Sequence, residues 1–139
     1  MQTAIQTGSI SKSKLWTGRI LTIVTVLFML FDITGHFVKP APVIDAFARL
    51  GIPISLSVAI GIILLICIIL YAIPRTAILG ALLLTGYLGG AVSIHLRAES
   101  SLFETTFPIL LGILAWAGIY LREDHLRAFI PLRNPHPQA

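Results

Sequence analysis

The residues best suited to chemistry are four ionisable side chains in or beside apolar segments. Asp32 lies within the first long apolar run and His36 follows four residues later; His95 ends the third run, and Glu104 precedes the fourth. A charge inside a membrane costs at least ~2.5–3.5 kcal/mol unless it is paired or hydrated, so such groups usually face the interior of a helical bundle. Residues four apart share one face of a helix, so Asp32 and His36 can form a hydrogen bond. Histidine also titrates near neutral pH, which suits it to proton transfer.

Three interpretations of these four groups remain open. As structural groups, they would reach interfacial water and pair with one another to close the end of the bundle. As functional groups, they would line a proton-handling or ligand-binding pocket that opens outward. Histidine and carboxylate are also acceptable metal ligands, but no close His/Cys spacing supports a metal, and we predict none. The candidate proton or ligand site is therefore Asp32, His36, His95 and Glu104.

The elements that must position these side chains are membrane helices. Of the 139 residues, 56% are hydrophobic and 12% are charged, whereas about one quarter of a soluble domain is charged. About 20 apolar residues cross a bilayer as a helix. Four windows have roughly this length, the last with Pro108 in its first turn: about Leu15–Phe37, Pro53–Ile73, Thr76–Leu96 and Thr105–Leu121. The sequence predicts an all-α membrane four-helix bundle that forms a single domain over residues 14–133.

The distribution of basic residues predicts the orientation of this bundle. An even number of spans puts both termini on one side, together with Lys12, Lys14, Arg19, Arg75, Arg122, Arg127 and Arg133. The opposite side has only Lys39, Arg49 and Arg97. By the positive-inside rule, both termini are cytoplasmic in a cell membrane. We expect residues 1–13 and 134–139 to be disordered tails. These cytoplasmic flanks explain the net charge of +4, so nucleic acid is not an implied partner.

Shorter elements connect or follow the spans. Val43–Leu50 has helical spacing of apolar residues and predicts a short interfacial helix, with Asp45 and Arg49 placed to pair at i,i+4. Only Pro74 and Arg75 separate the second and third spans, so these spans must be antiparallel neighbours. Arg122–Ile130 predicts a helical stub that lies on the surface.

Two strips of small residues are predicted to form packing seams. Helices in a membrane associate by close packing, which small residues permit. One strip is on the third span and the other on the fourth, and the two could face each other: Gly86, Gly90 and Ser93; Gly112, Ala115 and Gly118. A dimer face is the alternative for the first strip. The single cysteine, Cys67, is interpreted as a packing residue, because one thiol cannot form an intramolecular disulfide or a CxxC pair.

Several stretches of the chain resemble the DoxX-like family of small four-helix membrane proteins. They are WTGRI at Trp16–Ile20, FDITGHFVKPAPVIDAFARLGIP at Phe31–Pro53, YAIPRTAILGALLLTGYLGGAVSIHLR at Tyr71–Arg97 and YLREDHLRAFIPLR at Tyr120–Arg133. In similar sequences, an aspartate is followed four residues on by Lys or His and then by a KPAPV-like segment. Asp32 and His36 fit that pattern, and His95 and Arg97 match the IHLR-like end of the third block.

The resemblance implies a fold and a general role. The family takes its name from a membrane subunit of a thiosulfate:quinone oxidoreductase. It implies a protein of the lipid bilayer that acts as a membrane subunit or accessory factor of a quinone-linked redox system, with quinone as a possible cofactor and a redox enzyme as partner subunit. In that role Asp32 and His36 would accept or relay protons, while His95 and Glu104 border the pocket. The alternative is a non-catalytic packing or assembly protein whose polar cluster is structural.

Overall fold

The computed structural model describes residues 11–129, and these residues form helices joined by short turns. Residues 1–10 of the predicted first tail and all of the second, residues 134–139, lie outside the described residues. Residues 12 and 13 were predicted to belong to the first tail, but they are the first residues of a helix. In chain order the elements are α1 (Lys12–Val38), α2 (Ala41–Leu50), the 3₁₀ turn η1 (Ile54–Leu56), α3 (Ser57–Ala72), α4 (Ala77–Arg97), α5 (Leu102–Arg122) and α6 (Asp124–Phe129). The prediction of an all-α fold is confirmed.

Four of the helical segments in residues 11–129 are long and apolar enough to cross a membrane. They are Lys12–Val38, Ile54–Ala72, Ala77–Arg97 and Leu102–Arg122, and each predicted window agrees with its segment to within three residues at either end. Many large apolar side chains point away from the bundle, including Leu27, Phe31 and Leu102 at 62%, 78% and 80% exposed. A protein in water rarely exposes so large an apolar surface, whereas a surface in contact with lipid chains is apolar. The chain is a four-span membrane protein.

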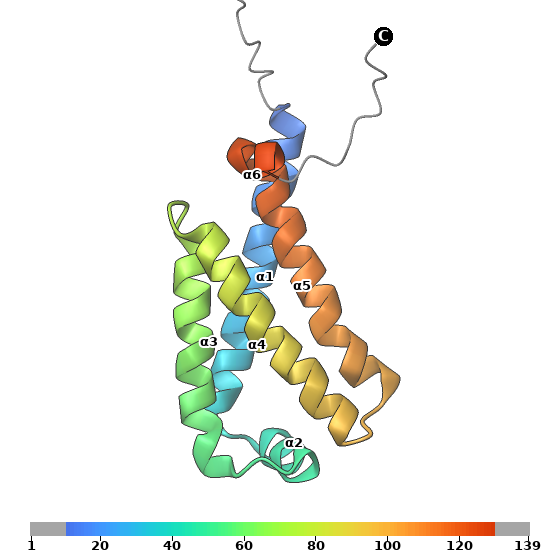
Figure 1. Ribbon diagram of the computed structural model, residues 1–139. Helices are drawn as coiled ribbons and strands as arrows, with labels where there is room; N and C mark the ends of the chain where they lie inside the picture. The colour runs from blue at the N-terminus through green and yellow to red at the C-terminus, as the bar shows by residue number, and fades with distance from the viewer. Residues whose placement is uncertain (1–10, 130–139) are drawn as a thin grey trace, which may run out of the picture.

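The spanning helices form a closed ring, as Figure 1 shows. Helix α1 packs against α3 and α5, and α4 packs against the same two helices from the other side, so α1 and α4 lie diagonally opposite. The start of α1 and helix α6 lie at one end of the bundle, and α2 lies at the other end. Both ends of the described chain are therefore on one side of the membrane. The cytoplasmic location of that side stays a prediction.

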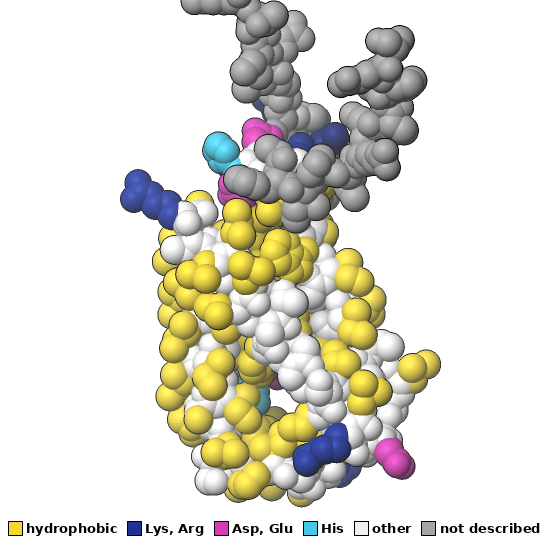
Figure 2. All heavy atoms as spheres, in the orientation of Figure 1, with side chains coloured by type: hydrophobic (Ala, Val, Ile, Leu, Met, Phe, Trp, Pro, Cys, Tyr) yellow, Lys and Arg dark blue, Asp and Glu magenta, His cyan; other side chains and the backbone are white. Residues whose placement is uncertain are grey.

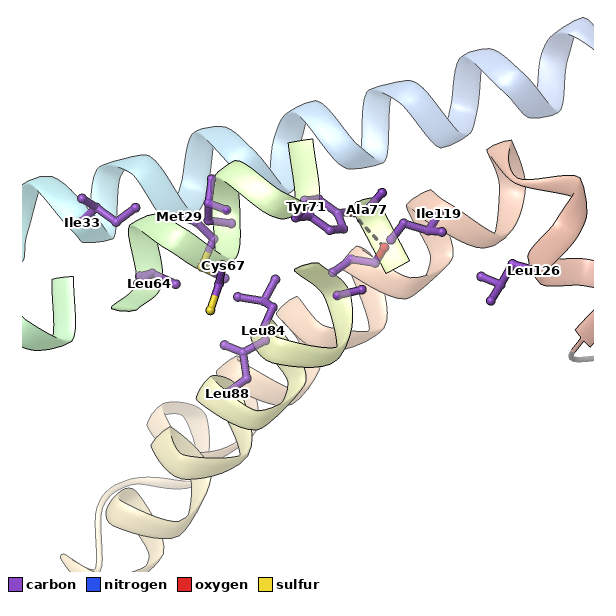
Figure 3. Close-up of a cluster of buried hydrophobic side chains, with 13 residues drawn as sticks. Met29, Ile33, Leu64, Cys67, Tyr71, Ala77, Leu84, Leu88, Ile119 and Leu126 are labelled. Atoms are coloured by element: carbon purple, nitrogen blue, oxygen red, sulfur yellow. Dashed lines mark hydrogen bonds between the residues drawn. The ribbon is translucent and has the colours of Figure 1, made fainter. Parts of the chain in front are cut away.

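The core of the bundle contains side chains from all four spans (Figure 3). Tyr71 and Leu64 of α3 are fully buried, as are Leu84 of α4 and Ile119 of α5. The Tyr71 hydroxyl donates a hydrogen bond of 2.9 Å to the Ala115 carbonyl, which satisfies the polar end of this side chain inside the core. Cys67, 4% exposed, is a free thiol in the same cluster. Its predicted packing role is confirmed.

The predicted seam residues of α4 do not pack against the other spans of the same chain. A Cβ atom built on Gly86 or Gly90 would meet nothing within 4 Å, and Ser93 is exposed. These residues therefore face away from the other helices of the bundle. The close contact of α4 is made instead by Gly80, where a Cβ would overlap the backbone of Leu70 and Tyr71 in α3. The glycine that packs precedes Gly86, the first residue of the predicted strip, by about one and two-thirds turns of the helix.

The predicted strip on α5 packs inside the bundle, but it does not face the strip on α4. Ala115 and Gly118 are buried, and a Cβ on Gly118 would lie 2.9 Å from the Thr22 hydroxyl of α1 and 3.3 Å from that of Tyr71. A Cβ on Gly112 would make only an ordinary contact of 3.6 Å with Leu88 of α4. The strip therefore contacts α1 and α3 through its C-terminal half.

The start of α5 also differs from the prediction. The helix begins at Leu102 rather than near Thr105, so Pro108 lies inside it and not in its first turn. The missing N–H of Pro108 leaves the Glu104 carbonyl without its i+4 donor. The earlier start is stabilised by a capping box, in which the Ser101 hydroxyl accepts from the Glu104 N–H and the Glu104 carboxylate accepts from the Ser101 N–H. The predicted interfacial and terminal helices are present as α2 and α6.

Candidate ligand site around His36

His36 lies on the buried face of α1. The buried residues of this helix recur every three or four positions, from Gly18 and Thr22 through Met29 to His36, which is the period of one helix face. On α3, Gly61 lets the two helices approach, since a Cβ there would come within 2.9 Å of the His36 Cβ. His36 is only 8% exposed. The fold therefore holds an imidazole inside a membrane bundle.

Polar groups from three helices surround the His36 ring. The Ser57 hydroxyl of α3 donates to the His36 carbonyl at 2.8 Å and lies 3.4 Å from Nδ1. On the other side of the ring, Nε2 lies 3.4 Å from the Tyr87 hydroxyl of α4 and 3.7 Å from Oδ2 of Asp32. Because the Ser57 proton is already used, we assign a proton to Nδ1, which leaves Nε2 to accept from Tyr87 in the neutral ring. A protonated ring would present a second N–H to Asp32.

The cluster is open at Asp32 and closed at His36. The Asp32 side chain is 50% exposed and that of His36 is 10% exposed. Phe47 of α2 is buried and packs edge-on against the imidazole, with ring centroids 5.7 Å apart. Figure 2 shows a hollow above α2, beside the lower half of α4, with histidine and acidic side chains visible inside it. Asp32 is therefore the member of the cluster that a ligand can reach.

The other two predicted site residues make separate contacts. His95 Nδ1 lies 3.1 Å from the Ser100 hydroxyl, in the turn that ends α4. Glu104 caps α5 and pairs with Arg49 of α2, both of whose terminal guanidinium nitrogens lie 3.3 Å from Oε1. Arg49 thus pairs with Glu104 rather than with its predicted partner Asp45. The structure brings Asp32 and His36 together and assigns the hydrogen bonds of His95 and Glu104 to other residues.

Sequence reasoning missed two members of the cluster, Ser57 and Tyr87. Tyr87 lies in the middle of a membrane span, where a phenol must find a hydrogen-bond partner. That requirement could have marked it as a site residue. Ser57 lies in the first turn of α3, and no local pattern connects it with His36, which is 21 residues away.

Comparison with protein families gives a match over most of the chain. The model of the DoxX-like family matches residues 20–118. The chain belongs to the DoxX-like family. No curated protein and no solved structure matches it. The matched residues of this DoxX-like protein include the whole cluster around His36.

The arrangement in this DoxX-like protein suits hydrogen bonding and proton transfer more than metal binding. Among residues 11–129, no three His, Cys, Asp or Glu side chains lie close enough to hold a metal ion. The cluster instead combines a carboxylate, an imidazole and a phenol within 3.7 Å of one ring nitrogen. When the His36 ring is protonated, its Nε2–H pairs with the Asp32 carboxylate, which lowers the cost of placing that charge in a membrane span. The three groups can hold a proton and hydrogen-bond to a polar ligand.

Proposed function

We propose that this DoxX-like protein is a membrane subunit or accessory factor of a quinone-linked redox system and that the cluster around His36 binds the quinone head group. The observation that carries the proposal is a buried imidazole inside a membrane span, with a phenol at 3.4 Å and a half-exposed carboxylate at 3.7 Å from the same nitrogen. Quinones dissolve in the bilayer, and their carbonyl oxygens accept hydrogen bonds from groups of this kind.

The cluster also fits the proton requirement of quinone chemistry. Reduction of a quinone to a quinol consumes two electrons and two protons. In this proposal the electrons come from a redox partner subunit, and the protons pass through this cluster. Protonated His36 donates to a quinone oxygen, and Asp32, the more exposed group, returns a proton to the ring. Tyr87 then orients the ring through its hydroxyl.

Binding of a short-chain benzoquinone to the purified protein in detergent tests the proposal. We expect His36→Gln and Tyr87→Phe to weaken binding at least about tenfold, because each removes a hydrogen-bonding group whose loss costs about 1.4 kcal/mol or more. Tyr87→Phe changes only one hydroxyl, so it keeps the test informative if His36→Gln folds poorly. His95→Gln is the matched control, since that ring contacts Ser100 rather than the cluster. Equal quinone affinity in His36→Gln, Tyr87→Phe and His95→Gln would refute the proposal.

A non-catalytic packing role is the second candidate. It is favoured by the Ser57 hydrogen bond to the His36 carbonyl and by the contact between Phe47 and the ring, which join α1, α2 and α3. In this case the cluster closes one end of the bundle. Substitution of His36 would then lower the melting temperature, and the wild-type protein would show no saturable quinone binding.

A further inference from the structure

A second polar site lies at the opposite end of the bundle, between α1, α3 and α5. A pocket of about 320 Å³ is lined by Arg19 and Arg122, by Thr22, and by apolar residues that include Ile23 and Leu27. No acidic side chain lines this pocket within the described chain. This pocket is distinct from the cluster around His36, because it lies at the other end of the bundle, is positively charged and is lined by different residues.

The guanidinium of Arg122 lacks acceptors within the described residues. Its Nε and Nη2 atoms are buried, and neither has a hydrogen-bond partner among residues 11–129. Buried donors without an acceptor are costly and rare, so an unpaired pair of them indicates an ion or ligand that completes the site. Among residues 11–129, neither of the neighbouring acids Glu123 and Asp124 forms an ion pair with Arg122.

The two unpaired nitrogens specify the geometry of the missing acceptor. In a planar guanidinium, Nε–H and one Nη–H lie along a single edge and point in the same direction. That edge matches two oxygens of one phosphate or carboxylate, and Arg binds phosphate in this bidentate way. Arg19 adds a second positive charge to the same pocket. The Thr22 hydroxyl already donates its proton to the Gly18 carbonyl. It therefore has no proton left to donate to an anion in the pocket.

The rest of the pocket fits an apolar chain. Ile23 and Leu27 follow Arg19 by one and two turns of α1, toward the middle of the membrane, and are 56% and 62% exposed. The site is therefore cationic at the end of the bundle and apolar toward its centre. A phospholipid has the same order, with its phosphate at the interface and its chains below. A free phosphate shares the anionic chemistry but would leave the apolar part unused.

We propose that Arg19 and Arg122 form a binding site for the phosphate of an anionic phospholipid, whose acyl chains lie along Ile23 and Leu27. The Nε and Nη2 edge of Arg122 receives two phosphate oxygens, and Arg19 neutralises the remaining charge. The site is independent of quinone binding. It gives the bundle a preference for anionic lipid at the end where the described chain begins and ends.

The test measures the thermal stability of the full chain in detergent, because a ligand that binds only the folded state raises the melting temperature. Three additions are compared: phosphatidylglycerol, phosphatidylcholine with the same acyl chains, and inorganic phosphate. Cys67 is the only cysteine and is buried, so a thiol-reactive fluorophore reports unfolding. We expect phosphatidylglycerol to raise the melting temperature in a saturable way and the other two additions to have little effect.

Variants locate the effect at the pocket. Arg19→Gln should weaken the apparent affinity for phosphatidylglycerol at least about tenfold, a loss typical of a charge-assisted hydrogen bond. Arg122→Lys keeps the charge but not the two-donor edge, and should also weaken binding. Arg75→Gln is the control, since it removes an exposed arginine from the turn between α3 and α4, outside the pocket. Equal stabilisation by phosphatidylcholine, full stabilisation by inorganic phosphate alone, or equal affinity in the Arg19→Gln and Arg75→Gln proteins would each overturn the proposal.

Discussion

Gly80→Ala and Gly86→Ala are the same substitution in one helix, and we expect only the first to destabilise the protein. A Cβ at residue 80 would overlap the backbone of Leu70 and Tyr71, which cannot rotate away as a side chain can. Helices α3 and α4 must then separate, although a turn of only a few residues joins them. A Cβ at residue 86 would meet nothing within 4 Å. Gly80→Ala should destabilise the bundle, and Gly86→Ala should not.

The magnitude follows from comparing the two variants. Each gains the same helix propensity, because Ala is about 1 kcal/mol better than Gly inside a helix. This gain cancels in the difference between the variants, which leaves the cost of overpacking at residue 80. Overpacking costs about 1–3 kcal/mol, and overlap with backbone favours the upper end of that range. Gly86→Ala alone should be neutral or slightly stabilising.

The buried thiol of Cys67 again reports unfolding in detergent. We expect Gly80→Ala to melt several degrees below Gly86→Ala, because a change of this size moves the melting temperature of a small domain by that amount. Equal melting temperatures would refute the assignment of Gly80 as the close contact. A loss of stability or of a dimer in Gly86→Ala would restore the predicted strip as a contact surface, between copies of the chain rather than within one.

Three further substitutions test individual hydrogen bonds with the same thiol assay. Ser101→Ala removes the N-cap of α5 and should cost about 1 kcal/mol; no loss would show that the capping box contributes nothing. Tyr71→Phe removes the buried hydrogen bond to the Ala115 carbonyl and should cost about 1 kcal/mol. An unchanged melting temperature would show that this hydrogen bond does not stabilise the core. Trp116→Phe removes the 2.8 Å hydrogen bond that Nε1 donates to the Thr85 hydroxyl on the outer surface of the bundle. It should also cost about 1 kcal/mol, because lipid chains supply no water to replace this bond; an unchanged melting temperature would refute this reasoning.

The sequence predicts the spans well because hydropathy and length determine them locally. The Asp32–His36 contact was also predictable, since a spacing of four residues brings two side chains together on any helix. Tyr87 was not, because its contact with His36 depends on how α4 is rotated about its axis relative to α1. The start of α5 was missed although its signal is present, as a serine three residues before a glutamate is a capping-box pattern.

The glycine strips show the same limit. A small-xxx-small pattern indicates that some helix could approach closely, but it does not say whether that face turns inward. In α4 the inward face is set by Gly80, Leu84 and Leu88, all buried, at steps of four residues. Gly86 and Gly90 lie on a different face, so their pattern carried no information about packing within one chain. Only the tertiary arrangement shows whether such a face turns toward the bundle or away from it.

The position of Asp32 decides how a ligand would reach the cluster around His36. Asp32 precedes His36 by four residues, so it lies about 6 Å deeper along α1, toward the middle of the membrane. Phe47 and Ser57 cover the histidine from the α2 end, whereas the deeper carboxylate is half exposed. A solute approaching from the water at that end would meet Phe47 first, and a molecule dissolved in the bilayer would meet Asp32 first. If these groups only extended to interfacial water, His36, which is nearer the end of the helix, would be more exposed than Asp32. The observed order is the reverse, so the geometry favours a ligand that comes from the membrane.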